Sequence, residues 1–288
     1  MRHWPLLCLA CAATFGQDFS DYKVEKAAAG FQFTEGPVWS REGYLLFSDV
    51  PNDRIFKFVP GEGHQVAREN SNGANGNTFD AKGRLYTCES RSRRVIRTDK
   101  SGKVEVLAQS YQGKRLNAPN DIVVRRDGQV YFTDPAFGRQ ADTRELDFYG
   151  VYRIGLKGEL ELIAKPDGRP NGIALSPDGG ILYVANSDEH NLRAYDLDAE
   201  GRASGERVLV AGIDGVPDGI RVDEKGNIYV TANGIHVYSA AGKKLATLSI
   251  PETPANCAFG DEDWQTLYVT ARTSLYRIRL DVKGAVQY

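Results

Sequence analysis

The chain has 288 residues, 30 of them glycine, and a formal net charge of −2, which suits one large domain with many turns. Its basic residues form no long stripe, so composition disfavours a protein that binds nucleic acid or an anionic membrane surface.

The first 16 residues have the features of a signal peptide. Arg2 and His3 precede an apolar run, residues 4–15, which is too short to cross a bilayer as a mature helix. Small residues near the end of this run offer cleavage sites. We therefore expect an exported protein, periplasmic or secreted. Its mature part, residues 17–288, is expected to be one domain without an integral membrane segment.

The rest of the chain is organised by a repeat, whose clearest copy spans residues 170–198. This copy has a polar residue and Gly, a short apolar run, a Pro-Asp-Gly turn, a β-rich run, a polar corner and an alternating run. The pattern predicts three short strands joined by a hairpin and a corner. Six copies align, at intervals of 38 to 51 residues. They begin at Glu35, Asn75, Asn120, Asn171, Asp218 and Asn256.

A period near 40–45 residues with several strands per unit is typical of a β-propeller blade. The sequence therefore predicts an all-β, six-bladed β-propeller with four-stranded blades. The sixth copy shows only three strands, and the ring must close without a free edge. We expect the N-terminal strand, which precedes the first copy, to supply the outer strand of blade 6.

Cys88 and Cys257 are the two cysteines outside the predicted signal peptide. They fall in blades 2 and 6, which are not neighbours in a six-bladed ring. We expect two buried free thiols, not a disulfide.

The first residues of the six copies should form a ring at one mouth of the central channel. All six side chains carry oxygen, and Glu35 and Asp218 are carboxylates. Tight-turn chemistry accounts for Asn75 and Asn171, each followed by Gly, but not for Glu35. Polar groups that face a channel need partners, and a hard divalent cation would satisfy them together. The ring therefore predicts a divalent metal site.

Further polar residues end the second strand of four copies and should lie around the same mouth. Each of them either caps its own corner or contacts a substrate. Blade 3 is also the longest, because of an insertion at residues 134–149 that contains Phe137. Such loops are often functional, although ordinary loop variation is the alternative. The four strand-end residues are Asp49, Glu89, Asp134 and Asn186.

Two other kinds of hydrolytic site are disfavoured. The chain has no G-x-S-x-G motif, so it lacks a serine nucleophile of the α/β-hydrolase type. Its histidines, at positions 3, 64, 190 and 236, lack the spacing of zinc ligands.

The starts of the copies resemble those of the regucalcin/gluconolactonase family of six-bladed propellers, and the bacterial gluconolactonase branch is the most similar. FTDPAFG at residues 132–138 and LNAPND at residues 116–121 resemble the pattern of that branch. The other matching stretches span nearly the whole mature chain in the family's order. They are residues 34–37, 75–76, 119–121, 132–135, 170–172, 217–219 and 255–257.

The resemblance implies one divalent metal ion in the channel mouth. Calcium is the first choice, and magnesium, manganese or zinc are alternatives. The implied ligands are Glu35, Asn171 and Asp218, with Asn120 completing the site directly or through water.

The implied activity is metal-dependent hydrolysis of a lactone, a cyclic ester. Asp218 would activate the attacking water. Asn75, Asn120, Asp134 and Phe137 are the residues that we expect to contact the small lactone substrate.

Two alternatives remain. The same metal could polarise a phosphoryl oxygen, as in a phosphotriesterase-like hydrolase, or the mouth could bind a ligand without catalysis. Regucalcin-type members also have an Arg two residues before the Asn that matches Asn120 and use it to contact a sugar lactone. This chain has Ala118 there, which weakens the expectation of an aldonolactone substrate.

Overall fold

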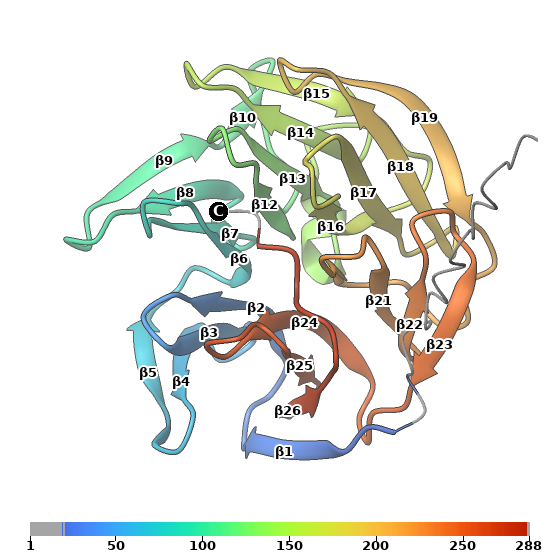
Figure 1. The fold of residues 1–288 in the computed structure, drawn as a ribbon. Helices are drawn as coiled ribbons and strands as arrows, with labels where there is room; N and C mark the ends of the chain where they lie inside the picture. The colour runs from blue at the N-terminus through green and yellow to red at the C-terminus, as the bar shows by residue number, and fades with distance from the viewer. Residues whose placement is uncertain (1–18, 20, 287–288) are drawn as a thin grey trace, which may run out of the picture.

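The computed structural model describes Phe19 and residues 21–286, and these form a ring of six four-stranded antiparallel sheets around a central channel (Figure 1). This confirms the predicted six-bladed β-propeller. The predicted signal peptide lies outside the described residues, so export stays a prediction.

Five blades are each built from four strands that follow one another in the chain, the first being innermost. Blade 1 contains β2 (Thr34–Ser40), β3 (Tyr44–Asp49), β4 (Arg54–Val59) and β5 (Gly63–Glu69). Blade 2 contains β6 (Ala74–Phe79), β7 (Leu85–Glu89), β8 (Arg94–Thr98) and β9 (Val104–Ala108). Blade 3 contains β12 (Ile122–Val124), β13 (Val130–Asp134), β14 (Gly150–Ile154) and β15 (Leu160–Ala164). Blade 4 contains β16 (Pro170–Leu175), β17 (Ile181–Asn186), β18 (Asn191–Leu197) and β19 (Ala203–Val210). Blade 5 contains β20 (Ile220–Val222), β21 (Ile228–Ala232), β22 (Gly234–Tyr238) and β23 (Lys244–Leu248).

Blade 6 closes the ring with strands from both ends of the chain. Its inner three strands are β24 (Pro254–Gly260), β25 (Thr266–Ala271) and β26 (Ser274–Arg279). Its outer strand is β1 (Val24–Ala29), which pairs antiparallel with β26. The predicted closure by the N-terminal strand is therefore confirmed, and it leaves β26 without a free edge.

Tyrosines that lie early in the second strands pack between neighbouring blades. Tyr268, for example, stacks on Trp39 of blade 1, with ring centroids 5.5 Å apart. The hydroxyl of Tyr229 donates to the Asp223 carboxylate at 3.1 Å. The hydroxyls of Tyr86, Tyr131 and Tyr268 likewise donate to acceptors, so these tyrosines add apolar area between blades while their polar groups stay paired. The fully buried members are Tyr86, Tyr131, Tyr183, Tyr229 and Tyr268.

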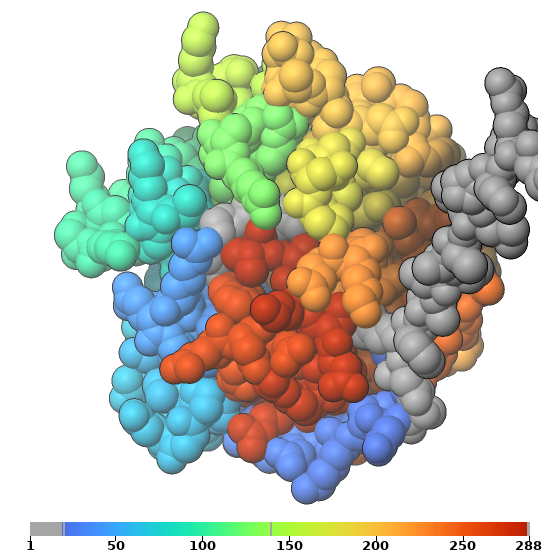
Figure 2. Space-filling model, in the orientation of Figure 1, coloured from blue at the N-terminus to red at the C-terminus, as the bar shows by residue number. Residues whose placement is uncertain are grey.

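The C-terminal segment crosses the end of the channel that lies away from the predicted ring. In Figures 1 and 2 it is the red chain over the centre of the propeller. The amides of Gly284 and Ala285 donate to the carbonyls of Trp264 and Val222, both at 2.9 Å. Beneath this segment is an apolar cavity of about 70 Å³. The segment thus covers one end of the channel and leaves the ring at the other.

The insertion of blade 3 contains η1 (Gly138–Thr143), a 3-10 helix, and it is preceded in the chain by a small hairpin, β10 (Ser110–Tyr111) and β11 (Lys114–Arg115). Among the described residues, no helix has the length and apolar character needed to cross a membrane.

Cys88 and Cys257 are buried and unbonded, as predicted. Burial raises the pKa of the Cys257 thiol to about 12, and the nearby carboxylates of Asp121 and Glu35 add to the effect. The thiol is therefore protonated at neutral pH and a poor nucleophile.

Glu252, in the connection between β23 and β24, holds the closing blade at its corner. Its carboxylate accepts from the amide and hydroxyl of Thr273, at 2.8 and 2.9 Å, and from the hydroxyls of Ser274 and Tyr276, at 2.5 and 2.8 Å. Burial by itself would raise its pKa, but these hydrogen bonds lower it to about 2.

We expect Glu252→Gln to destabilise the protein by on the order of 1–3 kcal/mol at pH 7, as measured by urea unfolding. A carboxylate whose pKa is depressed in the folded state contributes fully above its unfolded pKa, about 4.5. That contribution is lost as the pH falls towards 2. The difference between wild type and variant should therefore shrink between pH 5 and pH 3. Glu262→Gln, at an exposed turn, is the control, and a pH-independent difference would contradict this role.

Candidate functional site

The starts of the inner strands meet so closely that the backbone itself forms the mouth. The Gly76 amide donates to the Asn120 carbonyl at 2.8 Å, and the Gly172 amide donates to the Asp218 carbonyl at 3.1 Å. A Cβ atom on Gly172 would lie 2.2 Å from that same Asp218 oxygen. Only glycine allows this approach. The Gly that follows a ring residue therefore lets adjacent blades come close together, and the side chain of the ring residue lies near the common axis.

Glu35, at the start of β2, is one of two ring carboxylates and is 3% exposed. Burial raises its pKa to about 7, with a further increase from the charge of Asp121. The Gly36 amide, at 2.8 Å, and the Asn256 amide nitrogen, at 3.2 Å, donate to it and oppose the shift. Asp218, the other ring carboxylate, is partly exposed. Its pKa is raised well above the usual value, mainly because the carboxyl group is largely removed from water and also because Glu35 and Asp121 are negatively charged.

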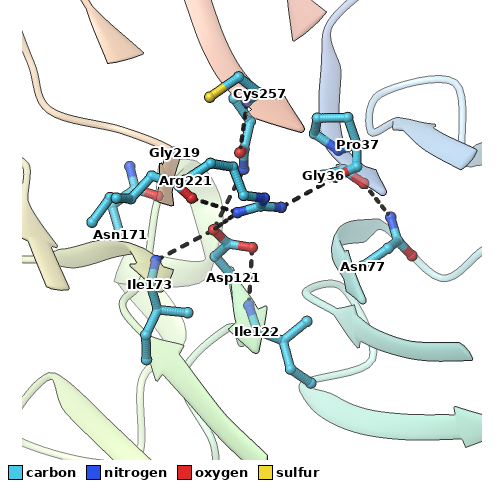
Figure 3. Close-up of polar contacts among 12 residues, drawn as sticks. Gly36, Pro37, Asn77, Asp121, Ile122, Asn171, Ile173, Gly219, Arg221 and Cys257 are labelled. Atoms are coloured by element: carbon cyan, nitrogen blue, oxygen red, sulfur yellow. Dashed lines mark hydrogen bonds and ion pairs between the residues drawn. The ribbon is translucent and has the colours of Figure 1, made fainter. Parts of the chain in front are cut away.

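A third carboxylate, Asp121, lies between residues of several blades and next to Arg221, as Figure 3 shows. It is 1% exposed and accepts from the amide of Ile122 at 2.9 Å. The guanidinium of Arg221 lies 3.8 Å from it and donates to the carbonyls of Ile220, at 2.6 Å, and Pro37, at 3.1 Å. Arg221 therefore supplies one positive charge inside the channel.

Sequence analysis missed both Asp121 and Arg221. One signal was available for Asp121, because four of the six ring residues are followed by Gly whereas Asn120 is followed by Asp. A carboxylate in place of this glycine is a departure that marks Asp121 as a candidate for a specific role. No comparable signal marks Arg221, since its role depends on contacts with blades 1 and 3.

The amides of the ring are used in two different ways. Asn256 donates from its side-chain nitrogen to Glu35 and, at 3.4 Å, to Asp121, while its oxygen accepts from the Cys257 amide. Asn171 and Asn75 instead each have a buried side-chain oxygen that has no hydrogen-bond partner among the described residues.

The remaining ring residue that we predicted as a ligand, Asn120, is 7% exposed and held by its main chain. Its amide donates to the Thr133 carbonyl at 2.9 Å, and its carbonyl accepts from Gly76. The structure thus brings Glu35, Asn120, Asn171 and Asp218 to one mouth, as predicted. Their role as ligands stays a prediction.

These residues suit a hard divalent cation. In the part of the chain that the structure describes, no three His, Cys, Asp or Glu side chains are close enough to hold a metal by themselves. Glu35 and Asp218 would have to be joined by amide oxygens, and unpartnered oxygens of this kind are what Asn171 and Asn75 provide. Buried carboxylates that repel one another also favour a cation between them.

Asp134, a predicted substrate contact, lies at the end of β13 and is fully buried. Its two carboxylate oxygens accept from the amides of Asn117 and Ala118, both at 2.8 Å. Burial raises its pKa to about 7 although these bonds oppose the shift. This geometry favours the alternative of a corner cap, in which Asp134 fixes the loop that leads to Asn120.

The other strand-end residues are also engaged in their corners. Asp49 accepts from the amides of Gln32 and Phe33, and Glu89 is buried in ion pairs with two arginines. Asn186 accepts from the amides of the corner that follows it.

Phe137, the other predicted substrate contact in the insertion, is half-buried next to the start of blade 4. The Arg169 guanidinium lies 4.5 Å from its ring centroid and pairs with Asp188 at 2.5 Å. Arg169 immediately precedes Pro170 and Asn171 in the chain. The structure therefore places Phe137 close to the mouth, and contact with substrate stays a prediction.

The fold and the site define a six-bladed β-propeller with a channel mouth lined by carboxylates and amides. The family model described as SMP-30/Gluconolactonase/LRE-like region matches residues 33–273. The chain therefore belongs to this family, as its motifs predicted.

Named relatives agree with this assignment. The chain is 34% identical to a gluconolactonase from Zymomonas mobilis subsp. mobilis, over 91% of this chain and 82% of the relative. The structure of a gluconolactonase from Xanthomonas campestris is 33% identical and has a TM-score of 0.84, covering 91% of this chain and 90% of the other. A calcium-binding regucalcin from Agrobacterium tumefaciens, at 19% identity and a TM-score of 0.76, shares the fold over 91% of this chain and 94% of its own.

We expect Asp134→Asn to lower the free energy of unfolding by about 1–3 kcal/mol, because an amide cannot accept from both backbone N–H groups. Urea unfolding at pH 6, below the raised pKa of Asp134, measures the loss, because ionising this buried carboxyl at higher pH lowers the stability of the wild type itself. Asp142→Asn, on the exposed surface of the same insertion, should leave stability unchanged. Equal stability of the two variants would argue against the cap.

Proposed function

We propose that this protein is a metal-dependent lactonase of the gluconolactonase type that opens a cyclic ester at the channel mouth. Its similarity to gluconolactonases supports the reaction class. The observation that supports the metal site is the convergence of two carboxylates, buried Glu35 and partly exposed Asp218, with the unpartnered amide oxygen of Asn171. The features of residues 1–16 support action outside the cytoplasm.

Glu35, Asn171 and Asp218 would hold the ion, and Asn120 would complete its surroundings directly or through water. Calcium is our first choice, because the ligands are hard oxygens and one relative of the same fold is a calcium-binding protein. Arg221 offsets the charge of Asp121, so Glu35 and Asp218 together match the two charges of the cation. When bound, the cation would polarise the lactone carbonyl and make an attacking water more acidic.

Asp218 is the ring carboxylate best suited to move a proton. It is partly exposed at the mouth, whereas Glu35 is buried and accepts two hydrogen bonds. A bound cation would lower the pKa of Asp218, but it would also make the attacking water more acidic, so the proton would pass between groups of similar affinity. Asp218 would take a proton from water as the water oxygen bonds to the carbonyl carbon. The ester C–O bond would then break, and the departing alkoxide would receive the proton that Asp218 had taken from the water, which leaves Asp218 ionised again.

The surroundings of the mouth indicate how a lactone would be held. Asn75 and Asn120 offer amides, and Phe137 offers the edge of an apolar ring. Ala118 stands where regucalcin-type members have an Arg, and it is 5% exposed. A methyl group there cannot hydrogen-bond a sugar hydroxyl. We therefore expect a lactone with fewer hydroxyl groups than an aldonolactone to be the better substrate.

We expect Glu35→Gln to weaken calcium binding at least tenfold in titration calorimetry. The substitution removes one of the two charges that offset the cation while retaining the shape of the side chain. Glu62→Gln, in an exposed turn, should bind as wild type does. Unchanged affinity in the Glu35 variant would refute its assignment as a ligand.

We expect Asp218→Asn to lower lactone turnover by about 10²–10⁴-fold when the metal is shown to be bound, because general-base assistance is typically of this size. Turnover is measured at saturating metal, with occupancy checked by metal analysis of the recovered protein. Asp167→Asn, at an exposed site before blade 4, should retain wild-type turnover. A metal-loaded Asp218 variant with the wild-type rate would limit this residue to holding the ion.

A further inference from the structure

The direction of the Asn171 amide decides whether this residue can bind a cation. A carboxamide has one end that accepts and one end that donates, and the two orientations have almost the same shape. A metal-binding asparagine therefore needs neighbours that distinguish its oxygen from its nitrogen. For Asn171, these neighbours come from the corner of its own blade and from the start of the next.

Ser187, which follows β17, is 2% exposed and contacts the Asn171 side chain. Its Oγ lies 3.0 Å from Asn171 Nδ2 and 2.8 Å from the carbonyl oxygen of Pro217. A carbonyl can only accept, so the single hydroxyl proton of Ser187 must be donated to Pro217. Only lone pairs of Oγ then face Asn171. The amide nitrogen must therefore point to Ser187, because the oxygen would be repelled.

The other end of the amide is consistent with this orientation. Asn171 Oδ1 is left buried without a partner in the described structure. An unpaired buried oxygen is costly by itself, and that cost disappears when a cation binds.

We propose that Ser187 is a positioning residue that orients the Asn171 amide so that its oxygen is available to a divalent cation. This inference rests on the proposed function. The same hydroxyl also connects two ligands from adjacent blades, because Pro217 immediately precedes Asp218. This inter-blade bond takes up the Ser187 proton and thereby sets the direction of the Asn171 amide.

Blade 2 contains a matched control. Ser90, at the corresponding corner, donates to the Pro119 carbonyl at 2.8 Å, and Pro119 precedes the ring residue Asn120. The inter-blade hydrogen bond is therefore the same as that of Ser187. The ring amide of blade 2, Asn75, does not donate to Ser90 in the described structure. Removing the Ser90 hydroxyl thus loses the link between blades but not the orientation of a ring amide.

Calcium titration calorimetry of the purified protein tests the proposal. Ser187→Ala should weaken calcium binding roughly 3- to 10-fold, the effect of one hydrogen bond that discriminates between two orientations. Ser187→Thr, which keeps the hydroxyl, should restore most of the affinity. Ser90→Ala should bind as wild type does. Ser187→Cys, with a poor acceptor, should reproduce the loss if the Ala variant proves not to fold in a thermal unfolding control.

A double-mutant cycle separates orientation from general support of the structure. Asn171→Asp presents oxygen at both ends and needs no orientation, so adding Ser187→Ala in that background should not weaken binding further. Unchanged affinity of the Ser187→Ala protein, an equal loss in Ser90→Ala, or the same loss in the Asn171→Asp background would each overturn the role of Ser187. A wild-type protein that binds no calcium, magnesium or manganese would instead overturn the proposed metal site and, with it, this role.

Discussion

Close approach of the six inner strands at one end of the channel is the constraint on which the rest of this structure depends. The strand starts are joined to one another by backbone hydrogen bonds, such as that from Gly172 to the Asp218 carbonyl. Glycine is needed where one blade passes the next, since a Cβ on Gly36 would lie 1.9 Å from the Asn75 carbonyl oxygen. The side chain that precedes each glycine is consequently held at the common axis with little freedom, and the site is preorganised by the fold.

This convergence has an electrostatic cost. Glu35, Asp121 and Asp218 come together in the channel. Burial raises the pKa of each, and repulsion from neighbouring carboxylates adds to the shift for Glu35 and Asp218. The protein offsets part of that cost through Arg221, whose guanidinium also bridges blades 1 and 5 by binding the Pro37 and Ile220 carbonyls. The charge that remains at the ring gives the mouth its affinity for a cation.

Both ends of the chain help to close the propeller and so support this arrangement. Pairing of β1 with β26 removes the edge of blade 6, and Glu252 holds the corner of the same blade. The segment that ends in Ala285 covers the far end of the channel, above an apolar cavity. Carboxylates and amides are therefore concentrated at the ring, while the opposite end is lined mainly by apolar side chains.

The sequence by itself determined the number of blades, their strand order and the identity of the ring residues. These follow from local signals, because turn residues and strand alternation recur with one period along the chain. It also indicated Glu35 as functional, since turn chemistry does not call for Glu before Gly.

What the tertiary structure decided depends on contacts between blades. Asp134 was predicted to contact substrate, with a corner cap as the alternative, and the structure favours the cap because its oxygens accept from Asn117 and Ala118. The role of Arg221 and the direction of the Asn171 amide could likewise not be predicted from the sequence, because the groups that position them lie in other blades or across a corner. Periodicity places a residue on a strand, but it does not specify which neighbour from another blade its polar atoms will contact.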